Sequence, residues 1–275
     1  FPDLNNQYVQ ILILAELFGC FTCFIPKKEF GTYSVQQPKS DRKLTIRTLV
    51  ATILILIAIP LTIYIGMNYF GGRKYYLVSI LIILETFIPF CMVFENRKPE
   101  ARELVVISVL CGIAVAGRTG FFMLPQFKPV TGLIIITGIC FGGEVGFLVG
   151  AITGFVSNMF FGQGPWTPWQ MFALGIIGFI AGILFRKGLL RKTKASICTF
   201  GAIITFFVYG GIMNPASVIM WQAKPNLEMI ASAYLMGITY DFIHALATAF
   251  FLWFIAEPMI DKLERIKIKY GLIER

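Results

Sequence analysis

The chain has very few of the residues and motifs on which catalysis usually depends. It holds a single histidine and only 15 Asp and Glu in 275 residues. No G-x-x-x-x-G-K-[ST] phosphate loop, H-E-x-x-H zinc motif or G-x-S-x-G nucleophile turn is present, and no acidic cluster would hold a metal. The chain therefore cannot hydrolyse ATP by itself, and general acid–base chemistry would have little to work with. Binding or transport is the favoured class, with no cofactor and no metal site expected.

Charged residues are also scarce, at 14%, whereas 57% of residues are hydrophobic. Crossing a hydrocarbon core of about 30 Å takes roughly 20 apolar residues per helix. Runs near that length cover 46–67, 76–95, 103–122, 143–161, 168–185, 195–213 and 233–256, with a shorter run at 129–142. The runs are apolar on all faces and show no strand alternation, which favours helices over a barrel. The sequence predicts an all-α integral membrane protein with about eight spans.

The formal charge of +9 reports membrane topology rather than nucleic-acid binding, because the basic residues collect in alternate short connections. The basic connections are 39–47, 97–102, 186–194 and 262–275. The connections between them hold only Arg73, Lys74, Arg118, Lys128 and Lys224. The positive-inside rule therefore predicts that the C-terminus is cytoplasmic.

The segment 158–170 is expected on the outer side and reads Asn-Met-Phe-Phe-Gly-Gln-Gly-Pro-Trp-Thr-Pro-Trp-Gln. Its prolines, Pro165 and Pro168, should deny it a continuous helix. Rigid aromatic faces beside uncharged hydrogen-bonding groups suit a large, partly apolar organic ligand better than an ion. The predicted ligand-binding residues are Asn158, Gln163, Trp166, Thr167, Trp169 and Gln170. The alternative is that the Trp residues belong to an aromatic belt that anchors the helices at the headgroups.

Two other outer connections, 118–129 and 213–222, have a similar character. Phe127 and Lys128 in the first, and Asn214 and Trp221 in the second, are further predicted ligand-binding residues. Three such connections on one face would form a pocket with a lid.

Asp241 and His244 are three residues apart and so share one helix face, about a third of the way in from the outer end of the last span. An ionisable group inside a membrane is costly and is therefore a functional hypothesis by default. The pair is predicted to reach a common ligand. The alternative is that the two bond each other or neighbouring helices and only hold the bundle together.

Small residues recur every four positions at Ser108, Gly112 and Ala116. This spacing on one helix face lets another helix approach closely. The partner helix is either in this chain or in another subunit.

These elements resemble the substrate-binding (S) component of energy-coupling factor (ECF) transporters, most closely the branch associated with cobalamin. The resemblance covers 103–270, and the matching elements are 115–118, 125–130, 146–150, 157–170, 240–245 and 261–265. It implies a six-helix protein of the prokaryotic plasma membrane that captures its vitamin outside and lacks ATPase activity. Transport then requires a separate scaffold subunit and two ATPase subunits. The family's A-x-x-x-A docking motif appears here only as the looser series Ser108, Gly112, Ala116.

The resemblance divides the chain into three parts. Residues 1–45 are an N-terminal segment of uncertain structure, 46–98 are two extra spans, and 99–275 are the six-helix core with a basic cytoplasmic tail. The expected function is capture of a vitamin, with cobalamin or a related corrinoid as the expected ligand. The alternatives are a solitary permease for a small organic solute and a membrane enzyme acting on a lipid or prenyl substrate.

Overall fold

The computed structural model describes residues 101–222 and 225–270, together with the single residues 57, 58, 61, 62, 64, 65, 81 and 85. The predicted N-terminal segment, 1–45, lies outside the described residues, and so does almost all of the pair of extra spans predicted at 46–98.

The described core is built of helices, and no strand occurs within it. The elements are α5 (Ala101–Gly120), α6 (Val130–Phe141), α7 (Gly143–Phe161), α8 (Thr167–Arg186), α9 (Lys194–Ile204), the π-helical turn η2 (Thr205–Tyr209), α10 (Gly210–Trp221) and α11 (Leu227–Lys269). The segments α9, η2 and α10 form one continuous span, Lys194–Trp221. Five helices are long and apolar enough to cross a membrane, and α6 is the sixth and shorter one. The predicted all-α membrane class is confirmed.

Helix boundaries differ from the predicted ones at two connections. The helix α7 runs to Phe161 and α8 begins at Thr167, so the tryptophan-rich connection is only 162–166. Pro168 lies in the first turn of α8, where its missing N–H costs no helical hydrogen bond. Arg118 likewise belongs to the last turn of α5 rather than to a connection.

The segment 213–222, predicted as an outer connection, is instead helical as far as Trp221. Pro215 has no N–H, so it cannot bond the carbonyl of Gly211 four residues earlier. The Tyr234 hydroxyl on α11 donates to that carbonyl oxygen at 2.9 Å and replaces the missing donor. The neighbouring helix thus lets α10 continue through a residue that ends most helices.

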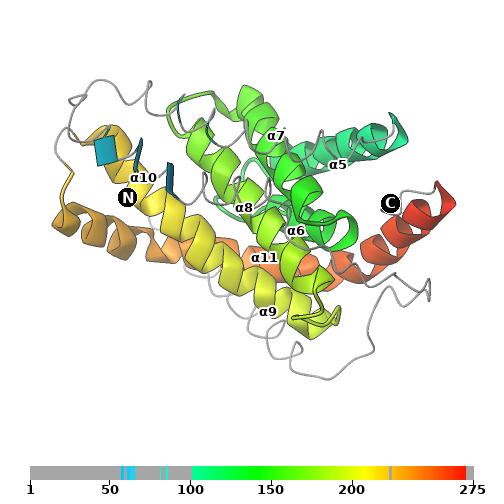
Figure 1. Cartoon of the computed structure of the whole chain (residues 1–275). Coiled ribbons are helices and arrows are strands. Elements are labelled where there is room, and N and C mark those ends of the chain that lie inside the picture. The colour runs from blue at the N-terminus through cyan, green and yellow to red at the C-terminus, as the bar shows by residue number, and fades with distance from the viewer. Residues whose placement is uncertain are drawn as a thin grey trace.

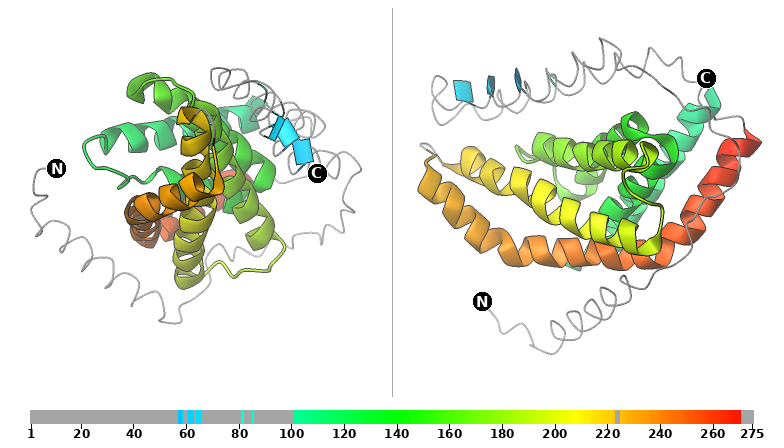
Figure 2. Two further views of the ribbon diagram at one scale, coloured as in Figure 1. Left: turned by 90° about the vertical axis from the view of Figure 1, so that its left-hand side faces the viewer. Right: turned by 60° about the horizontal axis from the view of Figure 1, so that its bottom comes forward.

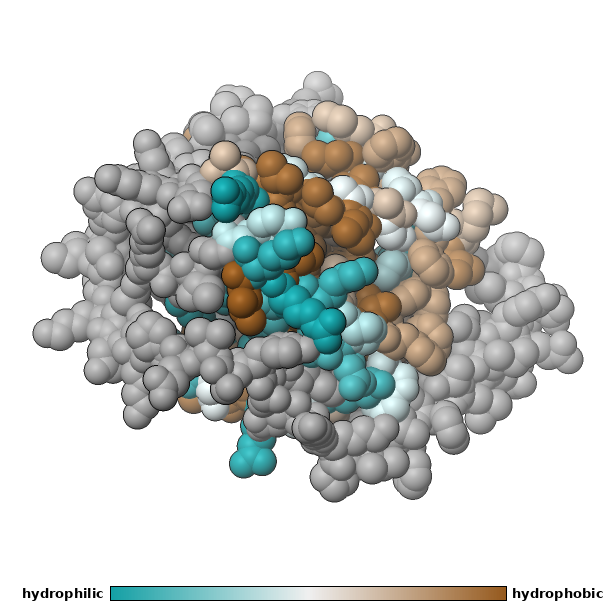
Figure 3. Space-filling view, turned by 90° about the vertical axis from the view of Figure 1, so that its right-hand side faces the viewer, coloured by the Kyte–Doolittle hydropathy of each residue, from teal (hydrophilic) through white to brown (hydrophobic). Residues whose placement is uncertain are grey.

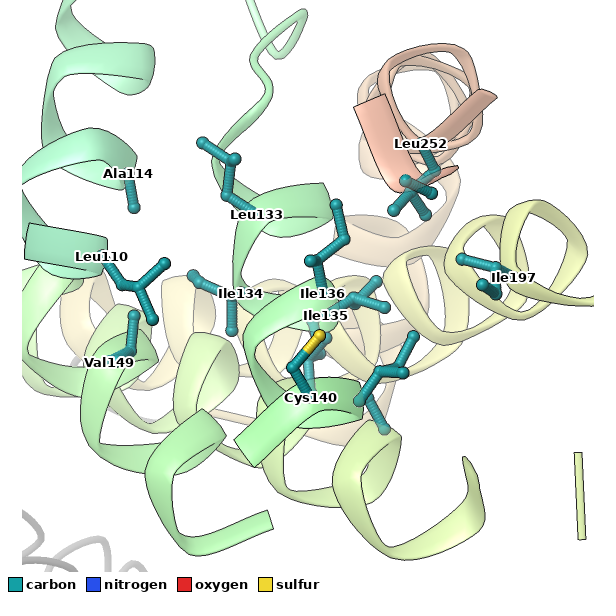
Figure 4. Close-up of a cluster of buried hydrophobic side chains, with 14 of the residues drawn as sticks. Leu110, Ala114, Leu133, Ile134, Ile135, Ile136, Cys140, Val149, Ile197 and Leu252 are labelled. Atoms are coloured by element: carbon teal, nitrogen blue, oxygen red, sulfur yellow. The ribbon is translucent and has the colours of Figure 1, made fainter. Parts of the chain in front are cut away.

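The centre of the bundle is α6, in which all twelve residues are buried. A helix of this length spans about 18 Å, well short of a hydrocarbon core. It is enclosed by apolar side chains from α5, α7, α9 and α11, of which Leu110, Val149, Ile197 and Leu252 are examples (Figure 4). The core therefore forms around the shortest helix of the six.

Glycines let α6, α7 and α8 approach almost to backbone contact. A Cβ added to Gly138 of α6 would lie 2.3 Å from the Gly178 carbonyl oxygen of α8, and one added to Gly178 would lie 2.3 Å from the Gly146 carbonyl oxygen of α7. Between α6 and α7, Gly142 has a φ of 96°, which only glycine adopts readily. The chain therefore reverses direction within a single residue.

The 43-residue helix α11 lies along the bundle and packs against both α9 and α10 (Figures 1 and 2). Its two ends define two ends of the molecule. At the C-terminal end, Lys192 forms a 3.1 Å ion pair with Glu264, and Lys267 donates to the Cys140 carbonyl at 3.0 Å. We call this the basic end; it lies on the side where hydrophilic residues gather in Figure 3. The opposite end, where α5, α7 and α10 finish, is called the site end.

Candidate ligand-binding site

A buried arginine organises the site end. The Arg118 side chain is 9% exposed, and its Nη1 donates to Ser157 Oγ and, at 3.0 Å, to Asn158 Oδ1 of α7. Its Nη2 donates to Gln170 Oε1 of α8 at 3.2 Å. The guanidinium carbon also lies 4.7 Å from the centre of the Phe161 ring, within the range of a cation–π contact. One cation thus ties α5 to both α7 and α8.

Asn158 links this arginine to the tryptophan-rich connection. Its Nδ2 donates to Gln170 Oε1 at 2.9 Å and to Thr167 Oγ1 at 3.1 Å, so both amide hydrogens are bonded. Thr167 in turn donates to Gln163 Oε1 at 2.9 Å and accepts from the Gly164 N–H at 3.2 Å. Four of the predicted polar site residues, Asn158, Gln163, Thr167 and Gln170, therefore form one network with Arg118, and this network fixes the course of 162–166.

The network continues toward α6 and α11 through Tyr209. The Tyr209 hydroxyl lies within hydrogen-bonding reach of the Gln170 side chain, and its ring meets the His244 ring edge to face at 4.6 Å. His244 Nε2 and Thr131 Oγ1 are 2.9 Å apart. We call the connected set Ser157, Arg118, Asn158, Gln170, Tyr209, His244 and Thr131 the polar layer. It draws a side chain from each of the five membrane-length helices and from the shorter α6.

Tyr209 owes its position to a local departure from α-helical geometry. It is the last residue of η2, a five-residue π-helical turn inside the span 194–221. Single π-helical turns are rare and concentrate at functional sites. Here the turn directs an aromatic hydroxyl into the polar layer.

Beside the polar layer lies a cluster of tryptophans from α8 and α10. Trp166 and Trp221 have ring centres 6.5 Å apart, and the buried Trp169 packs against Ala216 and Met220. The Trp169 indole nitrogen is buried and has no hydrogen-bond partner among the described residues. Trp221 is 63% exposed at the end of α10. We call Trp166, Trp169 and Trp221 the tryptophan cluster.

Asp241 and His244 share a helix face but have different partners. Asn214 Nδ2 donates to Asp241 Oδ2 at 2.6 Å, which joins α10 to α11. Each of these side chains lies over a glycine of the opposite helix: a Cβ on Gly210 would be 2.5 Å from Asp241 Oδ2, and one on Gly237 would be 2.4 Å from Asn214 Oδ1. His244 instead contacts Thr131 and Tyr209. Both residues thus bond neighbouring helices.

The connection 121–129 holds the other two predicted residues. The Phe127 ring is buried against Phe250 and Phe251 of α11, at 5.5 and 5.2 Å between ring centres. Lys128 lies half-buried, with its ammonium 5.0 Å from the Phe161 ring centre. Burial lowers the pKa of Lys128, and the positive charge of Arg118 nearby lowers it further. Phe127 secures the connection, whereas Lys128 lies at the polar layer.

Ser108, Gly112 and Ala116 are all exposed on one side of α5. A Cβ added to Gly112 would meet nothing within 4 Å of described atoms. The described helices leave this face of α5 uncovered.

Four residues of the polar layer were not among the predicted site residues: Arg118, Ser157, Tyr209 and Thr131. Arg118 was the one that carried a signal. Arg118 stands seven positions before Pro125, the first proline of the connection, so the preceding helix can include it, and an arginine inside a span is a functional hypothesis. Ser157, Tyr209 and Thr131 resemble ordinary residues of an apolar helix until their partners are known. Among the residues that the structure describes, no group of three or more His, Cys, Asp or Glu is placed to hold a metal ion.

Five membrane-length helices packed around the shorter α6 make the described core that of an integral membrane protein, and the family match makes it a transporter component, not an enzyme. The chain belongs to the family of S components of ECF-type riboflavin transporters, whose family model matches residues 100–257. The predicted S component is thereby confirmed. Membership implies association with the ECF scaffold and ATPase subunits and binding of a small molecule. The predicted resemblance to the cobalamin-associated branch remains a prediction, because the family that matches is that of riboflavin transporters.

Two bacterial relatives are similar to the same part of the chain. A UPF0397 protein of Aliivibrio salmonicida is 33% identical over 139 residues, which cover 49% of this chain and 73% of the relative. A UPF0397 protein of Vibrio atlanticus is 27% identical over 125 residues, covering 43% of this chain and 68% of the relative. No solved structure matches the chain.

Proposed function

We propose that this protein captures a flavin, with riboflavin as the first candidate, at the site end of the bundle and delivers it for ATP-driven uptake by its partner subunits. The single observation that carries the proposal is the junction of the polar layer with the tryptophan cluster. Gln170 belongs to the polar layer and follows Trp169 directly in α8. A planar ring system with hydrogen-bonding edges needs such a combination of aromatic faces and neutral polar groups.

The orientation is part of this proposal. Basic residues flank the spans at the basic end, which the positive-inside rule assigns to the cytoplasm together with the C-terminus. The site end then faces outward. Ligand enters beside Trp221, stacks on the tryptophan cluster and hydrogen-bonds to the side chains of Gln163 and Gln170. Asp241 with Asn214, and His244 with its partners, form the floor beneath it, and Phe127 holds the neighbouring connection in place.

We further propose that the exposed face of α5 docks on the scaffold subunit. This face carries small side chains at three positions spaced four residues apart, Ser108, Gly112 and Ala116. Small residues let a partner helix approach closely. Replacing Gly112 by Leu fills this surface and should reduce co-purification with the scaffold at least tenfold, while ligand binding is retained. Recovery of an intact complex from the Gly112→Leu variant would refute the assignment of this face.

The nature of the ligand is tested by purifying the protein in a mild detergent and identifying any bound small molecule by absorbance and mass spectrometry. Titration with riboflavin and with cobalamin then follows. The flavin proposal expects saturable riboflavin binding below micromolar concentration. Saturable binding of cobalamin alone would instead support the corrinoid predicted from the sequence resemblance. Binding of neither ligand would remove both assignments and leave the family membership intact.

A further inference from the structure

Arg118 and Lys128 give the site end a positive charge that no described side chain neutralises. The oxygen atoms that accept from Arg118 belong to Ser157, Asn158 and Gln170, all of them neutral. Ion pairs between described residues occur at the basic end, where Lys192 meets Glu264 and Lys194 meets Glu257. Neither Arg118 nor Lys128 has such a pair within 101–222 and 225–270. A cation held inside a membrane protein is costly unless an anion accompanies it.

The acidic side chain of Asp241, on α11, does not serve as that anion. Its Oδ2 accepts from Asn214 at 2.6 Å, and the carboxylate lies directly over Gly210 in the contact between α10 and α11. The two cations meanwhile share the Phe161 ring, at 4.7 and 5.0 Å from its centre. Two like charges on one ring repel each other, and an anion placed between them relieves the repulsion of both.

The guanidinium of Arg118 also has N–H donors free to bind an anion. Arginine carries five N–H donors, and three of them bond described side chains. The two that remain suffice for the bidentate bond that guanidinium forms with a carboxylate or a phosphate. The three neutral partners fix the plane of the guanidinium, so little freedom is lost when the anion binds.

We propose that Arg118 and Lys128 form an oxyanion subsite, so that the captured ligand carries a phosphate or carboxylate group beside the ring system held by the tryptophan cluster. The inference rests on the proposed function and refines its substrate class: for a flavin, the phosphorylated form, FMN, is preferred over neutral riboflavin.

The test compares riboflavin and FMN, which differ by one phosphate, in equilibrium titrations of the full chain followed by flavin fluorescence. The wild-type protein should bind FMN at least tenfold more tightly than riboflavin. Arg118→Gln and Lys128→Gln should each reduce this ratio of affinities to below threefold. Lys128 lies in a connection and is only half-buried, so Lys128→Gln should fold. It measures the contribution of the subsite even if Arg118→Gln does not fold. The matched control, Lys262→Gln, removes an exposed lysine at the basic end and should leave the ratio unchanged.

Equal affinities, or tighter binding of riboflavin, would overturn the subsite and leave the proposed function standing. If neither flavin binds, the flavin proposal fails. The existence of the subsite is then tested separately, by the effect of inorganic phosphate on thermal unfolding. Phosphate should then raise the unfolding temperature of the wild-type protein above that in chloride of equal ionic strength, and Lys128→Gln should abolish the difference. Absence of the difference in the wild-type protein overturns the subsite as well. Phosphatidylglycerol added to the micelles should not displace FMN; displacement would assign the subsite to a lipid headgroup and overturn the inference about the ligand.

Discussion

Replacing Asn158 by Ala should cost the protein much of its stability, because this one side chain holds three others. Asn158 is 1% exposed and bonds Arg118 at 3.0 Å, Thr167 at 3.1 Å and Gln170 at 2.9 Å. A neutral hydrogen bond contributes about 1 kcal/mol net, and one to a charged group about 2 kcal/mol, so the loss should be about 4 kcal/mol. The alanine side chain makes none of these three hydrogen bonds, and Arg118 and Thr167 stay buried without theirs.

The assay is equilibrium unfolding of purified protein in mixed micelles, with helicity followed by circular dichroism. The control is Gln163→Ala in the adjoining connection. Gln163 also makes two hydrogen bonds, to the Phe155 carbonyl and from Thr167, but it is exposed and water can replace them. Its loss should cost about 1 kcal/mol or less. An Asn158→Ala protein as stable as the Gln163→Ala protein would refute the view that the polar layer holds α5, α7 and α8 together.

Two further predictions concern the contacts between helices. Gly178→Ala places a Cβ 2.3 Å from a carbonyl oxygen of α7 and should lower the unfolding free energy by about 3 kcal/mol, since the backbones must separate. Gly112→Ala meets nothing within 4 Å and should be at least as stable as the wild-type protein; equal loss in both variants would contradict the close packing. Tyr234→Phe removes the donor to the Gly211 carbonyl and should cost about 1 kcal/mol in thermal unfolding. Tyr240→Phe, on the same helix, should cost less, and the reverse order would contradict the role of Tyr234 in sustaining α10.

The spans were predictable because they depend on a property that the sequence carries directly. A run of apolar residues is a helix in a bilayer whatever it packs against, since the backbone must bond within itself. The short α6 was predictable for the same reason, although its central position was not. That position depends on glycines such as Gly138 and Gly178, whose partners lie on other helices.

The site was predictable only in part, because its residues act through partners far away in the sequence. Asn158 and Gln170 were identified by their polarity within an aromatic segment, and the structure joins them through Arg118. Arg118 itself was counted as a topological charge, since charge counting treats every basic residue near a helix end alike. Asn214 and Pro215 suggested a connection, yet the Tyr234 hydroxyl compensates for the proline and the helix continues. Such compensation is visible only once the helices are packed.

The measurement that tests the central claim most directly is riboflavin affinity in a Trp166→Ala/Trp169→Ala double variant, compared with Trp253→Ala. Trp253 lies toward the basic end, where the Lys194 ammonium stacks on its ring at 4.5 Å. Co-purification with the scaffold subunit reports that each variant is folded. Loss of stacking on two aromatic faces should weaken binding at least tenfold in the double variant, since a well-placed aromatic contact is worth about 1 kcal/mol beyond the area it buries. Trp253→Ala should bind as the wild-type protein does. Unchanged affinity in the folded double variant, or an equal loss in Trp253→Ala, would contradict the placement of the ligand at the site end.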